Sequence, residues 1–358
     1  MRIIITADIH NGLPGKLHDC LWSMDTISNY ARTNDIHTVI ILGDLFHDRV
    51  NLNIETASLV YDKIKEYHTK HGQKWIVFPG NHDMFLKNSW GINTLHIFGD
   101  FMQIFEGTGQ FEIGKQVFKV IPFIHYESEY MKILSKINEE SSSDDILLTH
   151  VGVHGATLNE CFLVKNWNTI TFDDVKFKRI YTGHFHCHQQ VGDKTWYPGS
   201  PIPFRFDEGV VDHGFLVYDI ENETHEFINI FELSNEKDRP PKFLMIVDDD
   251  IPKYASFLDK NHVRIILSKD YTHNEMITLK DALKKRGALS VDWMLPKKEI
   301  QEITTSQLKL SEINTPENLF SSWLETDKPD LDKNVLLAAF KQIAQEAEER
   351  YVVEEDQE

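Results

Sequence analysis

The decapeptide TVIILGDLFH (residues 38–47) joins a short, almost wholly apolar run to a glycine and an aspartate. Such a run is typical of a strand that is covered on both faces of its sheet. Four other runs share this character: RIIIT (2–6), WIVF (75–78), DILLT (145–149) and RIYT (179–182). Apolar residues recur every three or four positions over 17–33 and 53–71, which predicts helices between strands. This alternation predicts a layered α/β fold.

The later part of the chain predicts smaller units. FEIGKQVFKVI (111–121) and GFLVYDIENETHEFINIFEL (214–233) are typical of hairpins, with turns at Gly114-Lys115 and Glu221-Asn222. NEKDRPPKF (235–243) has two prolines in a charged run and indicates a boundary. We therefore expect a first domain over 1–238, a small α+β domain over 239–298, and an acidic linker with a C-terminal helix over 299–358. That helix is read from residues 332–352, whose apolar side chains can share one stripe.

Composition narrows the class of protein. With 358 residues and 41% apolar content the chain can form a packed core. Its three scattered cysteines predict neither a disulfide framework nor a cysteine-rich zinc site, and no apolar stretch approaches the ~20 residues of a membrane span. We therefore expect a cytoplasmic protein without a membrane anchor.

The net charge of −19 argues against a protein that binds nucleic acid unaided, because phosphate backbones repel acidic surfaces. The charge is uneven, however, since residues 301–358 hold 14 acidic and five basic side chains. The rest of the chain is less repulsive than the total suggests.

Polar side chains follow the ends of the five predicted strands, where open α/β sheets bind their ligands. GHFHCH (183–188) alone could be ordinary surface or core histidine, although its alternation points two imidazoles the same way. The ordered recurrence at all five strand ends favours a functional site. The candidate ligands are Asp8, His10, Asp44, Asn81, His150, His184 and His186. His154 is the alternative to His150, which we prefer because it directly follows its strand.

Two aspartates, one asparagine and four histidines suit two divalent ions such as manganese, iron or zinc better than calcium, which prefers oxygen ligands. Seven ligands for two ions leave positions open for water and substrate. Two ions ~3.5–4 Å apart can activate a bridging hydroxide and neutralise charge on a phosphoryl oxygen. The pattern therefore predicts phosphoester hydrolysis.

In this order, DIH, GDLFH, GNHD, LTH and GHFH resemble the five signature motifs of calcineurin-like metallophosphoesterases, over about the first 235 residues. The resemblance implies a layered β-sandwich flanked by helices, with a small capping domain and a C-terminal helical extension. GDLFHDR (43–49) and YPGSPIPFRFDE (197–208) are similar to the nuclease subunit of SbcCD-type double-strand-break repair complexes and its phage recombination relatives.

Carried to this chain, the resemblance implies roles for single residues. Asp8, His10, Asp44 and His186 would hold one metal, and Asp44, Asn81, His150 and His184 the other, so that Asp44 bridges. The metals would be Mn²⁺, with Mg²⁺ as the alternative. His82 would protonate or steady the departing 3′ oxygen. His47 stands where phosphatases of this scaffold place an aspartate, and its imidazole can contact DNA phosphate.

The resemblance also implies an activity and partners. The expected protein is a DNA nuclease, a 3′-to-5′ exonuclease on duplex ends and an endonuclease on single strands, for end processing and recombination. It would work with an SbcC-type ATPase whose coiled coil the C-terminal region binds, although that helix could equally pack on its own domain. A homodimer through 53–71 and 89–98 is implied as well. The alternatives are a small-molecule or cyclic-nucleotide phosphodiesterase and a non-catalytic scaffold, which the complete ligand set disfavours.

Other residues near the motifs receive lesser roles. Asp83 is expected to orient its neighbours or cap a turn, not to bind metal. His188 is expected to pack, and His125 to be half-buried. The stretch 204–206 is expected to place a core aromatic pair, with a DNA-facing loop as the alternative.

Overall fold

The computed structural model describes residues 1–86, 90–159, 162–163, 169–172, 174–209, 211–233, 239–294, 336–337 and 340. The chain divides into two compact units, Met1–Pro296 and Lys297–Glu358. The helix expected over 332–352 lies outside the described residues, apart from three positions. The boundaries at residues 238 and 298 therefore stay predictions.

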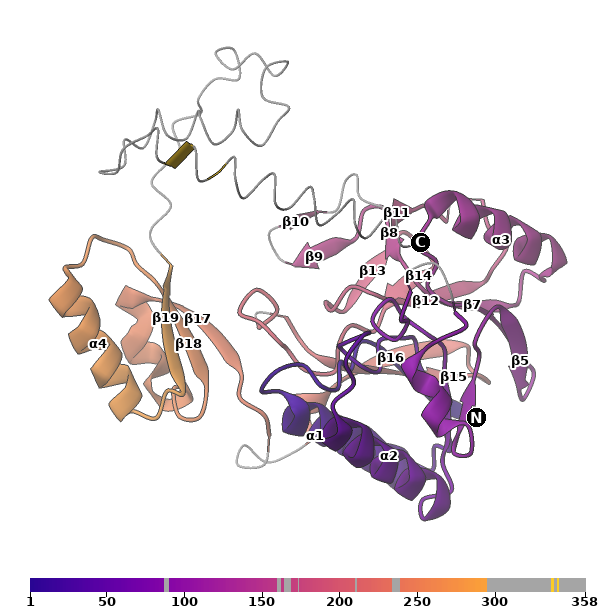
Figure 1. The fold of residues 1–358 in the computed structure, drawn as a ribbon, viewed down its shortest axis with the longest axis horizontal. Helices are drawn as coiled ribbons and strands as arrows, with labels where there is room; N and C mark the ends of the chain where they lie inside the picture. The colour runs from indigo at the N-terminus through magenta and orange to yellow at the C-terminus, as the bar shows by residue number, and fades with distance from the viewer. Residues whose placement is uncertain are drawn as a thin grey trace, which may run out of the picture. The chain divides into compact units, whose positions relative to one another are not determined.

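The first sheet has six strands in the order β16-β15-β1-β2-β3-β4. Four strands of this sheet are parallel and follow each other along the chain: β1 (Arg2–Thr6), β2 (Thr38–Ile41), β3 (Lys74–Val77) and β4 (Met102–Ile104). The hairpin of β15 (Gly214–Asp219) and β16 (Thr224–Asn229) joins antiparallel to β1. The helices α1 (Leu17–Thr33) and α2 (Ile54–Thr69) contact one another beside this sheet (Figure 1).

The second sheet has the order β13-β14-β12-β7-β6-β5. Its strands are β5 (Gly109–Ile113), β6 (Gln116–Ile121), β7 (Ile146–His150), β12 (Arg179–Gly183), β13 (Gln189–Val191) and β14 (Thr195–Tyr197). Four short strands, β8 (Gly152–Val153), β9 (Thr157–Asn159), β10 (Phe162–Leu163) and β11 (Thr169–Ile170), pair in two separate ladders, β8 with β11 and β9 with β10. Two 3₁₀ turns, η1 (Thr94–Phe98) and η2 (Ile230–Glu232), complete this part.

The strand sequences explain why the sheets are covered on both faces. In β1, Ile3 and Ile5 pack in a cluster with Leu148 of the second sheet, whereas Ile4 packs among residues of α1 and α2. All three isoleucines are fully buried. Because side chains alternate along a strand, a run of apolar residues fills the space between the sheets and the space under the helices. The structure therefore confirms the expected β-sandwich flanked by helices.

The outer face of the second sheet is covered by α3 (Glu127–Glu140), a helix that the sequence did not predict. Leu134 and Tyr130 are its buried residues, and the Tyr130 hydroxyl lies 2.8 Å from Thr149 Oγ1. The helix is largely exposed, and only a narrow stripe of its side chains is apolar.

The small unit expected after the proline pair forms its own layer. Its parallel sheet consists of β17 (Phe243–Val247), β18 (His262–Ile266) and β19 (Ser290–Met294). The connections are the 3₁₀ segment η3 (Asp248–Phe257) and α4 (His273–Lys285), whose first turn is closed by a capping box of Thr272 and Glu275. A separate apolar cluster, centred on Val263 and Ile265, holds the unit together. Among the described residues no helix is both long and apolar enough to cross a membrane.

Two substitutions on α3 test how this helix is held. Leu134→Ala empties a site that is 2% exposed and is expected to cost about 2–5 kcal/mol of unfolding free energy. Met131→Ala, at a position 39% exposed on the same helix, is expected to stay within about 0.5 kcal/mol. Urea denaturation followed by circular dichroism measures both, and equal costs would contradict this packing.

Candidate metal centre

The candidate ligands lie at the ends of β1, β2, β3, β7 and β12, with His150 as the last residue of β7 and the others on the loops that follow their strands. Asp8, His10, Asp44 and His184 have positive φ angles of 53°, 54°, 55° and 102°. Non-glycine residues adopt such angles rarely and at a cost in free energy, and they concentrate at functional sites. Four of the seven non-glycine residues with positive φ in the described chain are therefore candidate ligands.

Two glycines allow these loops to approach one another. Gly43 has a φ of +87°, and a side-chain carbon placed there would lie 2.6 Å from His150 Nδ1. A carbon at Gly80 would overlap the Asp44 carboxylate. The glycines of GDLFH and GNHD are thus required by the close approach of the loops.

One group of donors forms around His10 and His186. Their Nε2 atoms lie 3.1 Å apart, and His10 Nε2 lies 3.8 Å from Asp44 Oδ2. Donor atoms of Asp8, His10 and His186 all fall within 4.8 Å of one another. The orientation of the Asp8 carboxylate is fixed by the His184 backbone N–H, which donates to its two oxygens at 3.1 and 3.2 Å.

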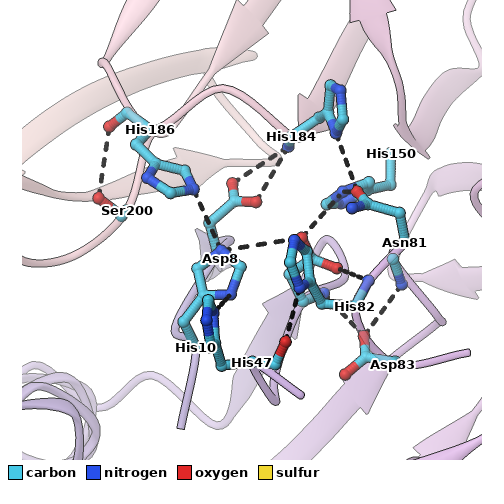
Figure 2. Close-up of polar contacts among 12 residues, drawn as sticks. Asp8, His10, His47, Asn81, His82, Asp83, His150, His184, His186 and Ser200 are labelled. Carbon is cyan, nitrogen blue, oxygen red and sulfur yellow. Dashed lines mark hydrogen bonds and ion pairs between the residues drawn. The ribbon is translucent and has the colours of Figure 1, made fainter. Parts of the chain in front are cut away.

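A second group forms around Asn81 (Figure 2). Its Oδ1 lies 3.0 Å from His150 Nε2 and 2.9 Å from His184 Nδ1. Asp44 Oδ2 lies 3.4 Å from His150 Nε2, so that Asp44 reaches both groups of donors. The structure therefore brings together all seven residues that the sequence singled out, and their ligation of metal stays a prediction.

The electrostatics of this centre fit a bound cation. The carboxylates of Asp8 and Asp44 are buried, and the charged neighbours that act to lower their pKa values are histidines. Burial alone would lower the pKa of His150, but Asp44 raises it to about 9, so a positive charge is favoured between them. A divalent ion can replace that proton. Burial lowers the pKa of His184 to about 3, which keeps its imidazole neutral as ligation requires.

Asp83 ties two of these loops together, as the sequence suggested. Its Oδ2 accepts backbone N–H groups of Asp44 and Gly80 at 2.7 and 3.0 Å and of Leu45 at 3.4 Å. Its Oδ1 accepts that of Phe46 at 3.0 Å. One buried carboxylate therefore fixes the loop after β2 against the loop after β3.

Glu208 is a residue to which the sequence assigned no role. It is 1% exposed, and its Oε1 lies 2.9 Å from His186 Nδ1. Burial alone would raise the pKa of Glu208, but the hydrogen bond and charge of His186 lower it to about 2. A carboxylate behind a metal-binding histidine fixes the ring and raises its basicity. The only sequence signal was its place at the end of YPGSPIPFRFDE.

His82 and His47 form a stacked pair beside the donors. Their ring centroids lie 5.2 Å apart with planes 14° from parallel. His82 Nδ1 donates to the His47 backbone oxygen at 2.6 Å, because a carbonyl can only accept, and this leaves Nε2 for a substrate. Ligand atoms of His10, His47 and His82 also lie within 4.8 Å of one another, so these three histidines form a further group that could hold a metal. The separate roles that the sequence assigned to His47 and His82 stay predictions.

A cavity of about 600 Å³ opens onto this side of the centre. It is lined by His10, Leu13, Pro14, Lys16, His47, His82, His186, Phe204, Arg205 and Glu208. Phe204 is buried, and its ring lies 5.5 Å from the rings of both His10 and His186. It thus forms an apolar wall of the site, as the expected core aromatic, and the exposed Arg205 next to it faces the cavity.

The remaining histidines lie apart from the donors. His154, the alternative to His150, is exposed and lines a different pocket with Val191 and Lys194. His188 donates to the Tyr197 backbone oxygen and stacks on Phe227, which is a packing role. His125 is half-buried and contacts Phe123 and Tyr126.

Comparison with known proteins gives one family. The family model of the calcineurin-like phosphoesterases matches residues 1–188, more than half of the chain. A protein of Invertebrate iridescent virus 3, whose provisional name is phosphoesterase 078R, is 22% identical over 185 residues. The match covers 49% of this chain and 51% of the viral protein, so the chain spans about half the length of that relative.

Two solved structures are also similar. One is GAP50, described as the anchor in the inner membrane complex of Plasmodium, with a TM-score of 0.46 and 12% identity over 65% of this chain and 86% of its own. The other is a dimetal phosphatase from Danio rerio, with a TM-score of 0.37 and 12% identity over 61% and 91% of the two chains. At these TM-scores neither structure carries an argument about this chain.

Asp83→Asn tests the link between the loops. An amide nitrogen would face backbone N–H donors, so we expect a loss of about 1–3 kcal/mol in unfolding free energy and weaker metal binding. Urea denaturation with and without Mn²⁺ measures both effects. Asp35→Asn, at an exposed position, is the control, and equal behaviour of the two variants would contradict the role of Asp83.

Glu208→Gln tests the carboxylate behind His186. The variant keeps the size of the side chain but removes its charge, and we expect metal affinity to fall about 10- to 100-fold. Isothermal titration with Mn²⁺ gives the affinity, and Asp207→Asn in the same loop controls for loss of one negative charge. Unchanged affinity in Glu208→Gln would show that Glu208 does not support a ligand.

Proposed function

The chain belongs to the calcineurin-like phosphoesterase family, and from this premise we propose that it is a two-metal DNA nuclease. The observation that carries the proposal is the arrangement of seven donors in two groups that share Asp44, with a pair of imidazoles beside them on an open cavity. Two carboxylates, one amide and four imidazoles are a donor set suited to two divalent ions of intermediate hardness, with Mn²⁺ first and Mg²⁺ second.

Bound ions would supply an activated water and positive charge for the phosphoryl oxygens. Asp8, His10, Asp44 and His186 would hold one ion, and Asp44, Asn81, His150 and His184 the other. The protein prepares this arrangement in advance, since Asp83, Glu208 and the His184 backbone fix the carboxylates and rings by hydrogen bonds. Such preorganisation means that little reorganisation is needed during the reaction.

His82 completes the reaction at the leaving group. Its Nδ1–H donates to the His47 carbonyl, so Nε2 is directed at the substrate and can give a proton to the departing oxygen when the ring is the imidazolium, which carries a proton on each nitrogen. Water attacks phosphorus and gives up one proton to solvent, the P–O3′ bond breaks, and the proton of His82 passes to the 3′ oxygen, which leaves a 5′-phosphorylated product. His47, stacked on His82 at the cavity, contacts the substrate phosphate.

DNA is proposed as substrate on two grounds. The first is the resemblance of GDLFHDR and YPGSPIPFRFDE to SbcCD-type nucleases, with His47 where phosphatases carry an aspartate. The second is local charge, because Lys16 and Arg205 line the cavity of a chain whose net charge is −19. Positive side chains at the site offset, at that point, the repulsion of phosphate by the acidic chain. End processing and recombination are the proposed context.

Two protein partners belong to the proposal. A second copy of the chain is supported by exposed apolar side chains near the ends of α2 and η1, of which Ile54 is 87% and Ile92 64% exposed. Exposed apolar residues of this kind are typical of protein interfaces. An SbcC-type ATPase is proposed for the C-terminal region on the resemblance alone, and it would supply further phosphate contacts.

A small-molecule or cyclic-nucleotide phosphodiesterase is the second candidate. The acidic net charge favours it, because a small substrate meets less of the surface than DNA does. The small unit over β17–β19 and His47 favour the nuclease.

Two variants test the site. Asp44→Asn keeps the size of the side chain and tolerates the positive φ, but removes the shared charge, so cleavage of end-labelled DNA with Mn²⁺ is expected to fall at least about 100-fold. His82→Ala is expected to lose about 100-fold or more while its metal affinity stays unchanged. His154→Ala, an exposed histidine outside the centre, is the control with full activity.

The same assay, run on duplex and single-stranded DNA and on a bis-aryl phosphodiester, separates the two candidates. Hydrolysis of the aryl ester without cleavage of either DNA, with Mn²⁺ or Mg²⁺, would replace the nuclease by the phosphodiesterase. Full activity of Asp44→Asn on every substrate would contradict the two-metal centre.

A further inference from the structure

We propose that Arg205 binds a phosphate group that neighbours the scissile phosphate, and so makes the site prefer substrates with several phosphates in a row. The inference deepens the proposed nuclease function and rests on it. It concerns a side chain outside the seven donors and the histidine pair.

Arg205 is exposed at the edge of the cavity that also contains His10, His47 and His82. Its side chain is 60% exposed, whereas its neighbours Phe204 and Glu208 are buried. Lys16 is the other permanent cation among the described residues that line this cavity. Both cations contact carboxylates, but the Lys16 side chain is only 12% exposed whereas that of Arg205 is 60% exposed. Arg205 is therefore the cation that an entering substrate meets.

The guanidinium group is held in a fixed orientation. Its Nε and Nη2 each donate to Glu208 Oε1 at 3.1 Å, and Nε lies 3.6 Å from Asp207. Glu208 is itself fixed, because its other oxygen accepts the Phe204 backbone N–H at 2.8 Å. An arginine has five N–H donors, so about three remain for a ligand after these two bonds. A fork held in this way loses little entropy when it binds phosphate.

The same glutamate oxygen connects Arg205 to the metal centre. Glu208 Oε1 lies 2.9 Å from His186 Nδ1, so a continuous chain of polar contacts runs from the guanidinium through Glu208 to His186. Arg205 itself contacts none of the seven donors in the described structure, because the buried carboxylate stands between them. The scissile phosphate belongs at the donors, and the guanidinium therefore meets the next phosphate along the strand.

Arg205 could have a purely structural role instead of a phosphate-binding role. With a structural role, Arg205 would only balance the buried charge of Glu208. Its loss would then disturb the position of the His186 ring and slow the hydrolysis of every substrate equally. A phosphate-binding role affects only substrates long enough to reach it. Substrate length therefore distinguishes the two readings.

The experiment compares the wild-type protein with Arg205→Ala, Arg205→Lys and the control Arg32→Ala, which removes an exposed arginine on α1. Mn²⁺ affinity is measured first for each variant. Steady-state kinetics then use a single-stranded oligodeoxynucleotide, a dinucleotide with one phosphodiester, and a bis-aryl phosphodiester. For Arg205→Ala we expect KM for the oligonucleotide to rise about 10- to 100-fold. Its kcat, and kcat/KM for the two short substrates, should stay within about threefold.

Two further results belong to the expectation. Arg205→Lys keeps the charge but cannot form the same fork to Glu208, so it should recover only part of the oligonucleotide affinity. The dependence of oligonucleotide KM on salt should weaken in Arg205→Ala, because one phosphate contact is lost. Arg32→Ala should behave as wild type in all assays.

Three outcomes would overturn the inference. An equal loss on all three substrates, or a loss of Mn²⁺ affinity that accounts for it, assigns Arg205 a structural role through Glu208. Unchanged oligonucleotide KM in Arg205→Ala leaves it without a role in binding. A wild-type protein that hydrolyses the aryl ester but neither nucleic acid removes the proposed function itself and this role with it, and that failure is visible before any variant is compared.

Discussion

The buried carboxylate of Asp83 is the constraint on which the metal centre depends. It accepts backbone N–H groups from the loops after β2 and β3, and without it the amides around Asp44 would lie buried without a partner. With these loops fixed, Asp44 reaches both groups of donors, and its Oδ1 accepts the His82 backbone N–H at 2.7 Å. One side chain thus positions the shared donor and the proposed acid together.

The backbone is strained at four of the candidate donors, and this strain must be compensated elsewhere in the fold. Asp8, His10, Asp44 and His184 adopt positive φ angles. These angles cost free energy, and an isolated loop would have no interactions to offset that cost. The two packed sheets supply the compensation, since the strands before these loops are buried at every residue except the first. The apolar core between the two sheets, together with the apolar clusters under the helices, therefore allows the loops to hold their geometry.

The sequence predicted the parts of the structure that depend on local pattern. The five central strands and the first hairpin are found within two residues of their expected bounds, and α1 has its expected bounds. The second hairpin ends at Asn229, four residues before its expected end, because η2 begins at Ile230. The strand-end rule singled out seven candidate donors that the structure brings together. The prediction from sequence did not include α3, whose side chains are mostly polar and exposed although its few apolar residues follow the helical period. It also gave no role to Glu208, because the partnership with His186 spans 22 positions and arises only in the folded chain.

The two donor groups draw on both sheets: Asp8, Asp44 and Asn81 follow strands of the first sheet, whereas His150 ends β7 and His184 follows β12 in the second. A divalent ion bound by residues of both sheets would link one sheet of the sandwich to the other. A ligand that binds only the folded state stabilises it relative to the unfolded and partly unfolded states by mass action. Resistance of the chain to proteases would then rise with the supply of metal, so that in a metal-poor cell the protein would be lost by degradation as well as by inactivity.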